Sequence, residues 1–348
     1  RAGVLRLYEQ LHRLDAGWGG IESYVKELID QHLFTFKKLY LNDESIKNLI
    51  IVDDYISPWV LRGGIKTKKD EMFEIGALKK LIKMLVTNDK PKAAQILGIS
   101  EEKIPLMLIS AVMIKRISEV TGADNIWAPG VTLGDGIAYE YAESMGLLKD
   151  DHDFERDIIA GAYNTLRRYK ESIKDSKALE SMALNIFDAT KRIHGLGKRE
   201  RLLLRLAAIL SKCGKYINMA DEGVISSQII MNTEIMGLSP GEHAVVANTV
   251  RLLYTEFVYG DGKETFDTLL VAKLSAILKM ASVFCLNPDK TPEKLTIAKD
   301  TGVITFNVSI LKDYAIESSI FKTNAVFFRE VFGVSPVLKI RKPRLGGQ

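Results

Sequence analysis

The spacing of hydrophobic positions changes along the chain and divides it into three blocks. In the first block, up to about residue 147, short continuous apolar runs alternate with stretches of helical spacing. The runs predict strands over residues 3–7, 48–52 and 126–131, and the second has the pattern of a buried parallel strand. The helical stretches predict helices over residues 22–40, 71–86 and 104–120, the last of which closes on Gly122.

Helical spacing continues without interruption through the second block, from about residue 153 to residue 286, and predicts helices over residues 179–193, 198–210 and 265–284. Ser239, Pro240 and Glu242 predict a helix start, because a serine cap, a proline at the first position and a glutamate at the third form a capping box. After a linker at residues 289–292, the third block predicts two strands around a hairpin turn, a helix and a strand: residues 295–297, 303–306, 315–332 and 337–341.

Composition restricts the class of protein only loosely. The 348 residues suggest two or three domains, and the net charge of +4, from 48 basic and 44 acidic residues, is too small to predict nucleic-acid binding. Cys213 and Cys285 lie in apolar helical patterns and are interpreted as buried, reduced thiols of a cytoplasmic protein. No apolar run approaches 18 residues, so no membrane span is expected. The sequence begins with Arg1 and an apolar pattern follows at once. We therefore expect the chain to be part of a longer protein.

Three stretches have the order and spacing of a known family. Residues 3–9 read GVLRLYE, residues 126–136 read IWAPGVTLGDG, and residues 194–210 carry HGLGKRER followed by RLAAIL. With these stretches the chain resembles the C-terminal portion of the exopolyphosphatase and guanosine pentaphosphate phosphohydrolase (Ppx/GppA) family, without its N-terminal actin-like domain.

The resemblance implies a fold of the α/β class followed by an all-α part. Residues 1–147 would form a partial ribonuclease-H-like half of the actin-like ATPase superfamily. Residues 148–288 would form an HD-like helical domain, and residues 289–348 a small β-β-α-β module with a tail. The implied activity is release of a terminal phosphate from polyphosphate or guanosine pentaphosphate, with Mg²⁺ serving the complete enzyme. The implied partners are therefore polyphosphate or guanosine polyphosphate, and we expect a homodimer.

The phosphate-binding motifs of the family are not repeated in this chain. Its catalytic glutamate and its D-I-G-G-G-S loop are absent, so no catalytic residue is assigned. Its second phosphate loop falls at residues 52–57, where Asp53 and Asp54 accompany Ser57. Phosphate loops work through exposed backbone N–H groups and glycine flexibility, whereas two carboxylates repel a polyanion. We therefore expect a degenerate loop here, and a simple turn at Gly63 and Gly64.

The metal-binding motif of an HD domain is also altered. An adjacent histidine and aspartate would bind a divalent cation there, but Ser211 and Lys212 occupy these two positions. None of the five histidines of the chain is paired with another at helical spacing, and a lysine ammonium opposes cation binding. We expect no metal and no cofactor bound by this chain.

Basic residues remain around this junction and leave two interpretations open. They are either solvated helix faces or a groove that binds a phosphate chain, and the candidates for such a groove are Arg192, Lys198, Arg205, Lys212, Lys215 and Arg251. Few aromatic residues accompany them, so binding of single-stranded nucleic acid is not expected. Residues 134–136 (GDG) are interpreted as a turn. The acidic positions Glu140, Glu143, Asp150, Asp151 and Asp153 are interpreted as a solvated hinge.

Two hypotheses of different classes follow. In the first, the chain is the C-terminal portion of a phosphohydrolase and is inactive by itself. In the second, it is a diverged, non-catalytic protein that binds polyphosphate or a guanosine polyphosphate through its basic residues, as a regulator or a dimerisation scaffold.

Overall fold

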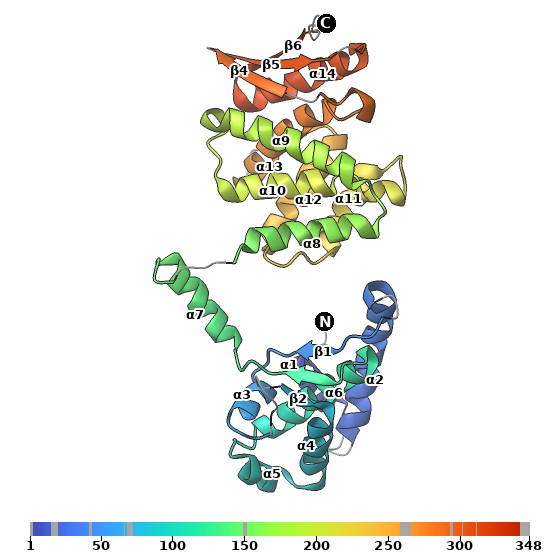
Figure 1. The fold of residues 1–348 in the computed structure, drawn as a ribbon, viewed down its shortest axis with the longest axis vertical. Helices are drawn as coiled ribbons and strands as arrows, with labels where there is room; N and C mark the ends of the chain where they lie inside the picture. Colours follow the sequence, from blue (N-terminus) through green and yellow to red (C-terminus); the bar gives the residue numbers. More distant parts are fainter. Residues whose placement is uncertain are drawn as a thin grey trace, which may run out of the picture. The chain divides into compact units, whose positions relative to one another are not determined.

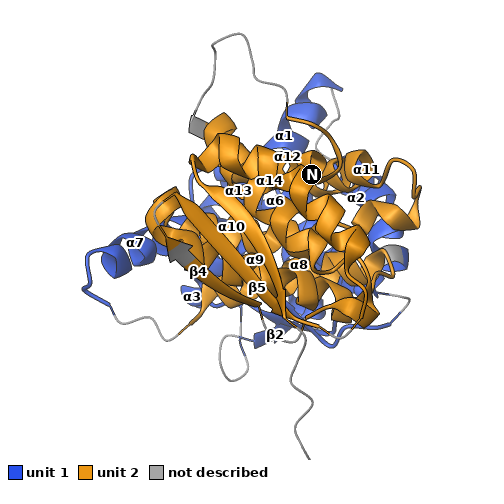
Figure 2. Cartoon of the chain, turned by 90° about the horizontal axis from the view of Figure 1, so that it is seen from above, with its two compact units in different colours: residues 1–150 blue, residues 151–348 orange. Residues whose placement is uncertain are grey.

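The computed structural model describes residues 3–14, 20–41, 44–65, 67, 72–148, 152–257, 266–292, 295–300, 302–310 and 312–341. The chain divides into two compact units, residues 1–150 and 151–348, each with a buried apolar core of its own (Figures 1 and 2). The described residues are mostly helical, and each unit also holds one three-stranded sheet. The division at residue 150 lies close to the boundary predicted at residue 147, and the limits of the three domains stay a prediction.

Ten helices and strands and one π-helical turn make up the described part of the first unit: α1 (Val4–Arg13), α2 (Ile21–Phe36), η2 (Lys37–Leu41), β1 (Asn48–Ile50), α3 (Ile56–Leu61), β2 (Met72–Glu74), α4 (Ile75–Thr87), α5 (Lys90–Leu97), α6 (Lys103–Thr121), β3 (Asn125–Trp127) and α7 (Leu133–Ser144). Helix α6 is apolar on nearly all sides, as expected of an enclosed helix, and packs against α1, α2 and α4. It ends at Gly122 in the left-handed conformation, which confirms the predicted cap.

The strand predicted over residues 3–7 is wrong, because this segment belongs to helix α1. Val4, Leu7, Tyr8 and Leu11 recur at positions i, i+3, i+4 and i+7, which places them on one face of a helix. Leu7 and Leu11 are buried, whereas Leu5, which a strand pattern pairs with them, is 61% exposed. The apolar repeat of this segment therefore has the helical period rather than the period of a strand.

The first sheet is mixed, with the strand order β1-β3-β2. Strand β1 runs parallel to β3, and β2 runs antiparallel to it. The prediction of a strand near residues 48–52 is confirmed, but the prediction that it is buried is wrong: Ile50 is 59% exposed and Val52 is 60% exposed. The reason is its position at an edge, where only β3 pairs with it. The helix predicted from residue 71 begins at Ile75, after β2.

Helices fill the second unit up to its sheet, as predicted: α8 (Phe154–Arg168), α9 (Ile173–His194), α10 (Lys198–Leu210), the short η4 (Cys213–Tyr216), α11 (Glu222–Asn232), α12 (Pro240–Tyr254) and α13 (Phe266–Val283). The capping box at the start of α12 is confirmed, since the Ser239 hydroxyl accepts from the Glu242 N–H and the Glu242 carboxylate accepts from the Ser239 N–H. Helix α13 is strongly apolar, yet no helix within the described ranges is both long and apolar enough to cross a bilayer.

The second unit ends in a sheet with the strand order β4-β5-β6, covered by one helix. After the 3-10 turn η5 (Pro288–Lys290) come β4 (Leu295–Asp300), β5 (Val303–Ser309), α14 (Ala315–Phe332) and β6 (Ser335–Arg341), which confirms the predicted β-β-α-β order. Strands β4 and β5 form an antiparallel hairpin, and β6 returns parallel to β5 (Figure 1). Phe306 of β5 contacts Phe284 after α13 and Phe321 and Phe328 of α14, so sheet and helices share one core.

Candidate functional site

Asp53 occupies the centre of the loop that the resemblance assigns to phosphate binding. Its carboxylate accepts hydrogen bonds from the backbone N–H groups of Tyr55 (3.2 Å), Ile56 (2.8 Å) and Ser57 (2.8 Å) at the start of α3. It also accepts from the hydroxyls of Ser57 and Ser110, each at 2.9 Å. The N–H groups that would face a phosphate in such a loop are thus held by a carboxylate of the chain itself.

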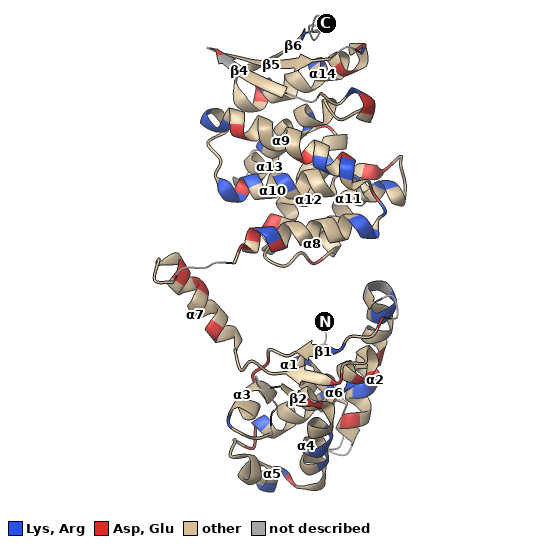
Figure 3. Ribbon diagram, in the orientation of Figure 1, with Lys and Arg blue, Asp and Glu red and all other residues tan. Residues whose placement is uncertain are grey.

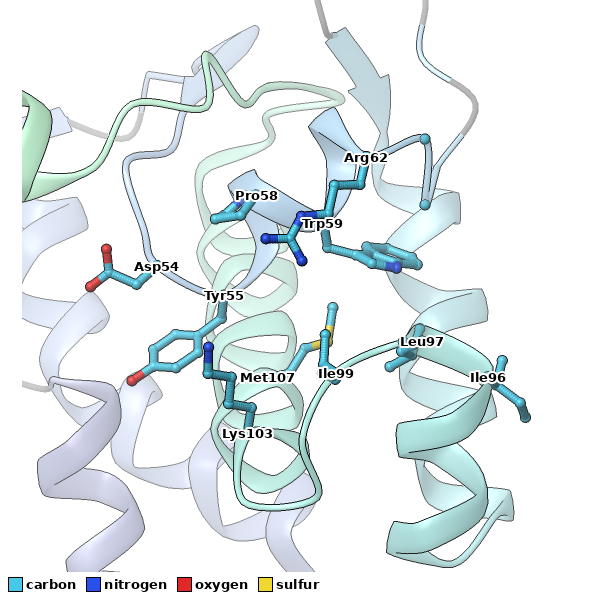
Figure 4. Close-up of a pocket in the computed structure, with 13 residues that line it drawn as sticks. Asp54, Tyr55, Pro58, Trp59, Arg62, Ile96, Leu97, Ile99, Lys103 and Met107 are labelled. Atoms are coloured by element: carbon cyan, nitrogen blue, oxygen red, sulfur yellow. The ribbon is translucent and has the colours of Figure 1, made fainter.

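A pocket of about 370 Å³ lies beside this loop, between α3 and the turn that joins α5 to α6. Figure 4 shows Arg62 and Lys103 projecting from α3 and from the start of α6 beside the rings of Tyr55 and Trp59, with Asp54 at the rim. Neither cation has an ion pair with another described residue. The pocket therefore combines two positive charges with aromatic walls, but an acidic group stands at its edge.

The turn predicted at Gly63 and Gly64 is confirmed. Gly63 has a φ of 81°, and a Cβ atom at Gly64 would lie 2.2 Å from the indole ring of Trp59. The turn fixes the position of this ring against the backbone, and so it shapes one wall of the pocket.

The junction after α10, where an HD domain would bind metal, is closed by hydrogen bonds within the chain. Ser211 is buried, and its carbonyl accepts from the Ser226 hydroxyl (2.9 Å) and from the Tyr254 hydroxyl (3.3 Å). The Gly214 N–H donates to the Ser226 oxygen at 2.8 Å. Cys213 is buried beside them, and burial raises the pKa of its thiol to about 12, so it is not a nucleophile.

Glu222 is an acidic group at this junction, and Glu171 is close enough to raise its pKa. It accepts a hydrogen bond of 2.9 Å from the Tyr254 hydroxyl. Burial raises the pKa of Glu222, while the hydrogen bond from Tyr254 and the positive charges of Lys212 and Lys215 oppose that rise. Lys212 and Lys215 thus lie near enough to Glu222 to favour its charged form.

Close packing leaves no room for an added group at this junction. A Cβ atom on Gly214 would lie 2.5 Å from the Glu222 carbonyl oxygen and from the Ser226 nitrogen. A Cβ atom on Gly223 would lie 2.5 Å from the ring of Tyr254. Helix α11 thus lies directly against η4 and the end of α12.

His194 has a structural role in the turn between α9 and α10. His194 is buried; its Nδ1 accepts from the Leu196 N–H at 2.9 Å, and its Nε2 lies 2.8 Å from the Phe187 carbonyl. It thereby fixes the turn between α9 and α10. Within the described ranges, no three histidine, cysteine, aspartate or glutamate side chains converge as metal ligands would.

The six candidate basic residues lie in separate places on the helices of the second unit, and a common groove for a phosphate chain stays a prediction. Lys198 and Lys212 stand at opposite ends of α10, and 14 residues of helix span about 20 Å. Arg192 is in the last turn of α9 and Lys198 begins α10, whereas Lys212 and Lys215 lie at η4. Figure 3 shows basic positions, in blue, on both α9 and α10. Arg251 lines a separate pocket on α12, with Glu256 and Asp267 beside it. Whether each residue binds an anion stays a prediction.

Three arginines near α10 already have carboxylate partners. Arg205 pairs with the buried Glu180, which also accepts from the Tyr163 hydroxyl. Arg199 pairs with Glu242 and holds the pKa of that carboxyl at about 2, and Arg201 pairs with Asp188 at 2.7 Å. Lys191, Arg192 and Lys198 at the α9–α10 turn form no ion pair with another described residue, and neither do Lys212, Lys215 and Arg251. At the turn the three basic residues lie within eight positions of one another.

Two further predicted features have different outcomes. Residues 134–136 are not a turn, because they lie in the first turn of α7, where Thr132 and Asp135 form a capping box. Within the acidic run, Asp153 caps α8 by accepting from the Arg156 N–H, and Glu140 and Glu143 lie on α7. Asp150 and Asp151 lie outside the described residues.

Comparison with known proteins gives two findings. Residues 160–324 match the family model described as Ppx/GppA phosphatase, domain III. The chain is also 22% identical over 264 residues to the guanosine-5'-triphosphate,3'-diphosphate pyrophosphatase of Pseudoalteromonas translucida (strain TAC 125), a match over 72% of this chain and 50% of the relative. The matched region thus spans about half the length of that curated relative. The resemblance inferred from the sequence is confirmed for the C-terminal part of the chain.

Proposed function

We propose that the chain is the C-terminal region of a phosphohydrolase of the Ppx/GppA family, because residues 160–324 match the model of domain III of that family. Its substrate would be a phosphate chain with a free end, polyphosphate or guanosine pentaphosphate. Residues 1–147 would supply a partial ribonuclease-H-like half, residues 148–288 an HD-like domain, and residues 289–348 the terminal module. This region would bind the phosphate chain in a cytoplasmic homodimer but would release no phosphate by itself.

One observation supports the proposal that this region releases no phosphate by itself. A carboxylate of the chain lies at the position where the resemblance implies a phosphate loop, and another lies at the position where it implies a metal site. Asp53 accepts the N–H groups at the start of α3. Glu222, held by Tyr254, faces the junction at Ser211 and Lys212. A group that is already hydrogen-bonded and charge-balanced gains little from a new ligand, because the existing contacts must be broken first.

The residues at the HD-like junction do not fit Mg²⁺, the metal implied for the complete enzyme. Magnesium takes hard oxygen ligands in near-octahedral geometry. The carboxylates of Glu222 and Glu171 lie near this junction together with the ammonium groups of Lys212 and Lys215, and no three acidic, histidine or cysteine side chains of the described residues converge there. No step of the reaction is therefore assigned to a metal held by this chain.

Binding of the phosphate chain is proposed at the α9–α10 turn, through Arg192 and Lys198 with Lys191 beside them. Charge reversal at an exposed site changes the affinity for an anion by about fivefold at low salt. We therefore expect Lys198→Glu to weaken tripolyphosphate binding about fivefold in calorimetric titration. The matched variant Lys212→Glu should bind as wild type does, because Lys212 lies at the other end of α10 from the proposed site. Equal affinity of all three proteins, or no binding to wild type, would refute this assignment.

A second candidate function is a diverged binding protein that regulates or scaffolds without belonging to an active enzyme. The carboxylates of Asp53 and Glu222 at the two implied ligand positions favour this function as well. It predicts the same result in the tripolyphosphate titration. It differs in that phosphate release would stay absent even after the N-terminal part of a family enzyme is added.

A further inference from the structure

Strand β6 leaves one edge of the second sheet without a neighbouring strand. It is the last strand in the order β4-β5-β6. The Ser335 N–H donates to the Gly302 carbonyl, and the Arg341 carbonyl accepts from the Ile310 N–H, so odd-numbered residues of β6 point their backbone groups toward the β5 side. Successive residues of a strand alternate. The carbonyls of Pro336, Leu338 and Ile340 and the N–H groups of Leu338 and Ile340 therefore point outward, and no described residue bonds to them.

An apolar groove of about 550 Å³ runs along this edge, between β6 and α14. In the parallel register, Phe306 pairs with Leu338 and Val308 with Ile340, which places Leu338 and Ile340 on the sheet face that α14 covers. Their side chains line the groove together with Phe321, Ala325 and Val326 of α14. Ile340 is 44% exposed and Val326 is 50% exposed, which is apolar surface that one more strand would cover.

The charged residues of β6 and of the groove lining, among the described residues, are positive. Lys322 and Arg329 of α14 line the groove, and Lys339 and Arg341 lie on the opposite face of β6. None of the four forms an ion pair with another described residue. Acidic side chains on an added strand would lie directly opposite Lys339 and Arg341, a cross-strand arrangement that stabilises pairing.

We propose that the free edge of β6 binds an extended, acidic segment of a partner protein as a fourth strand. Its backbone would pair with Leu338 and Ile340, its apolar side chains would fill the groove beside α14, and its alternate acidic side chains would face Lys339 and Arg341. This is the strand-addition mode of peptide recognition, in which backbone bonds supply affinity and side chains supply specificity.

A second copy of this chain fits the edge less well than an acidic partner. Pairing two β6 strands would bring two lysines and two arginines onto one face of the joined sheet, where like charges repel. Pro336 has no N–H, so two β6 strands would also form fewer backbone bonds than β6 forms with a proline-free partner. Basic residues and proline on an edge are known to discourage self-pairing, and an acidic strand removes the first of these obstacles.

The test uses the full chain and a fluorescein-labelled ten-residue peptide of alternating valine and glutamate. We expect fluorescence polarisation to detect binding that weakens as salt is raised. Ile340→Pro removes an outward N–H without removing a bond to β5, and should weaken binding about tenfold. The matched variant Ile340→Thr loses the same side chain but keeps the N–H, and should bind more tightly than Ile340→Pro. Lys339→Glu combined with Arg341→Glu should weaken binding further.

Several outcomes would overturn the proposal. They are no binding to wild type, equal binding to a valine–lysine peptide, or equal affinity of the proline and threonine variants. A dimer in sedimentation that Ile340→Pro dissociates would assign the edge to a second copy instead. If the proline variant fails to fold, a peptide with N-methylated valines tests the same bonds on wild type, and undiminished binding of that peptide would contradict strand addition.

Discussion

Gly214→Ala should lower the free energy of unfolding of the second unit by about 3 kcal/mol. The added Cβ atom would lie 2.5 Å from the Glu222 carbonyl oxygen and 2.5 Å from the Ser226 nitrogen. Both are backbone atoms of α11. Backbone cannot rotate away as a side chain can, so α11 must shift. That shift would also disturb the hydrogen bond from the Gly214 N–H to Ser226.

The measurement is urea unfolding followed by far-ultraviolet circular dichroism, with tryptophan emission recorded in parallel. All three tryptophans of the chain, Trp18, Trp59 and Trp127, lie in the first unit, so their transition should not move. Gly241→Ala is the matched control, because nothing lies within 4 Å of its Cβ position in α12, and it should change stability by no more than about 0.5 kcal/mol. Equal stability of the two variants would show that α11 does not pack against η4 as described.

Asp53→Ala should destabilise the first unit by about 3 kcal/mol. The change leaves three N–H groups at the start of α3 and the hydroxyl of Ser110 without their carboxylate partner. Tryptophan emission reports this transition directly, since Trp59 lies on α3 itself.

The neighbouring Asp54→Ala is the matched control for this loop. Asp54 is exposed and forms no hydrogen bond with another described residue, so the control should be close to neutral. If the two alanine variants were equally stable, Asp53 would not hold the N–H groups of this loop, and the loop would be open to an external anion.

Local signals in the sequence predicted the helical part of the fold well. The helix predicted over residues 198–210 coincides with α10, and the capping box at Ser239 begins α12. Both depend on residues within one or two turns of each other. The prediction of a strand over residues 3–7 is wrong because five residues are too few to distinguish the alternation of a strand from the period of a helix. A window that extends to Leu11 shows the helical period. The exposure of β1 depends on strand order, which no local pattern contains.

Sequence reasoning can reach the contacts of the candidate site only where the residues involved are close together in the chain. Asp53 bonds to residues two to four positions ahead, so the Asp-x-x-x-Ser spacing could have indicated a cap instead of a failed phosphate loop. Glu222 and Tyr254 were missed because they meet across 32 positions, through the packing of α11 against α12. The same reason applies to Arg62 and Lys103, which meet at one pocket only in the folded unit.

Asp53 lies at the loop and Glu222 lies at the junction beside Ser211, the two positions at which the resemblance implies a phosphate loop and a metal site. The proposed function therefore expects no release of phosphate by this chain alone. The most direct test is phosphate release from polyphosphate and from guanosine pentaphosphate with Mg²⁺, using the folded chain over a range of protein concentrations. We expect release equal to that of the protein-free blank. Release that rises in proportion to protein and stops when Mg²⁺ is chelated would contradict this account of both positions.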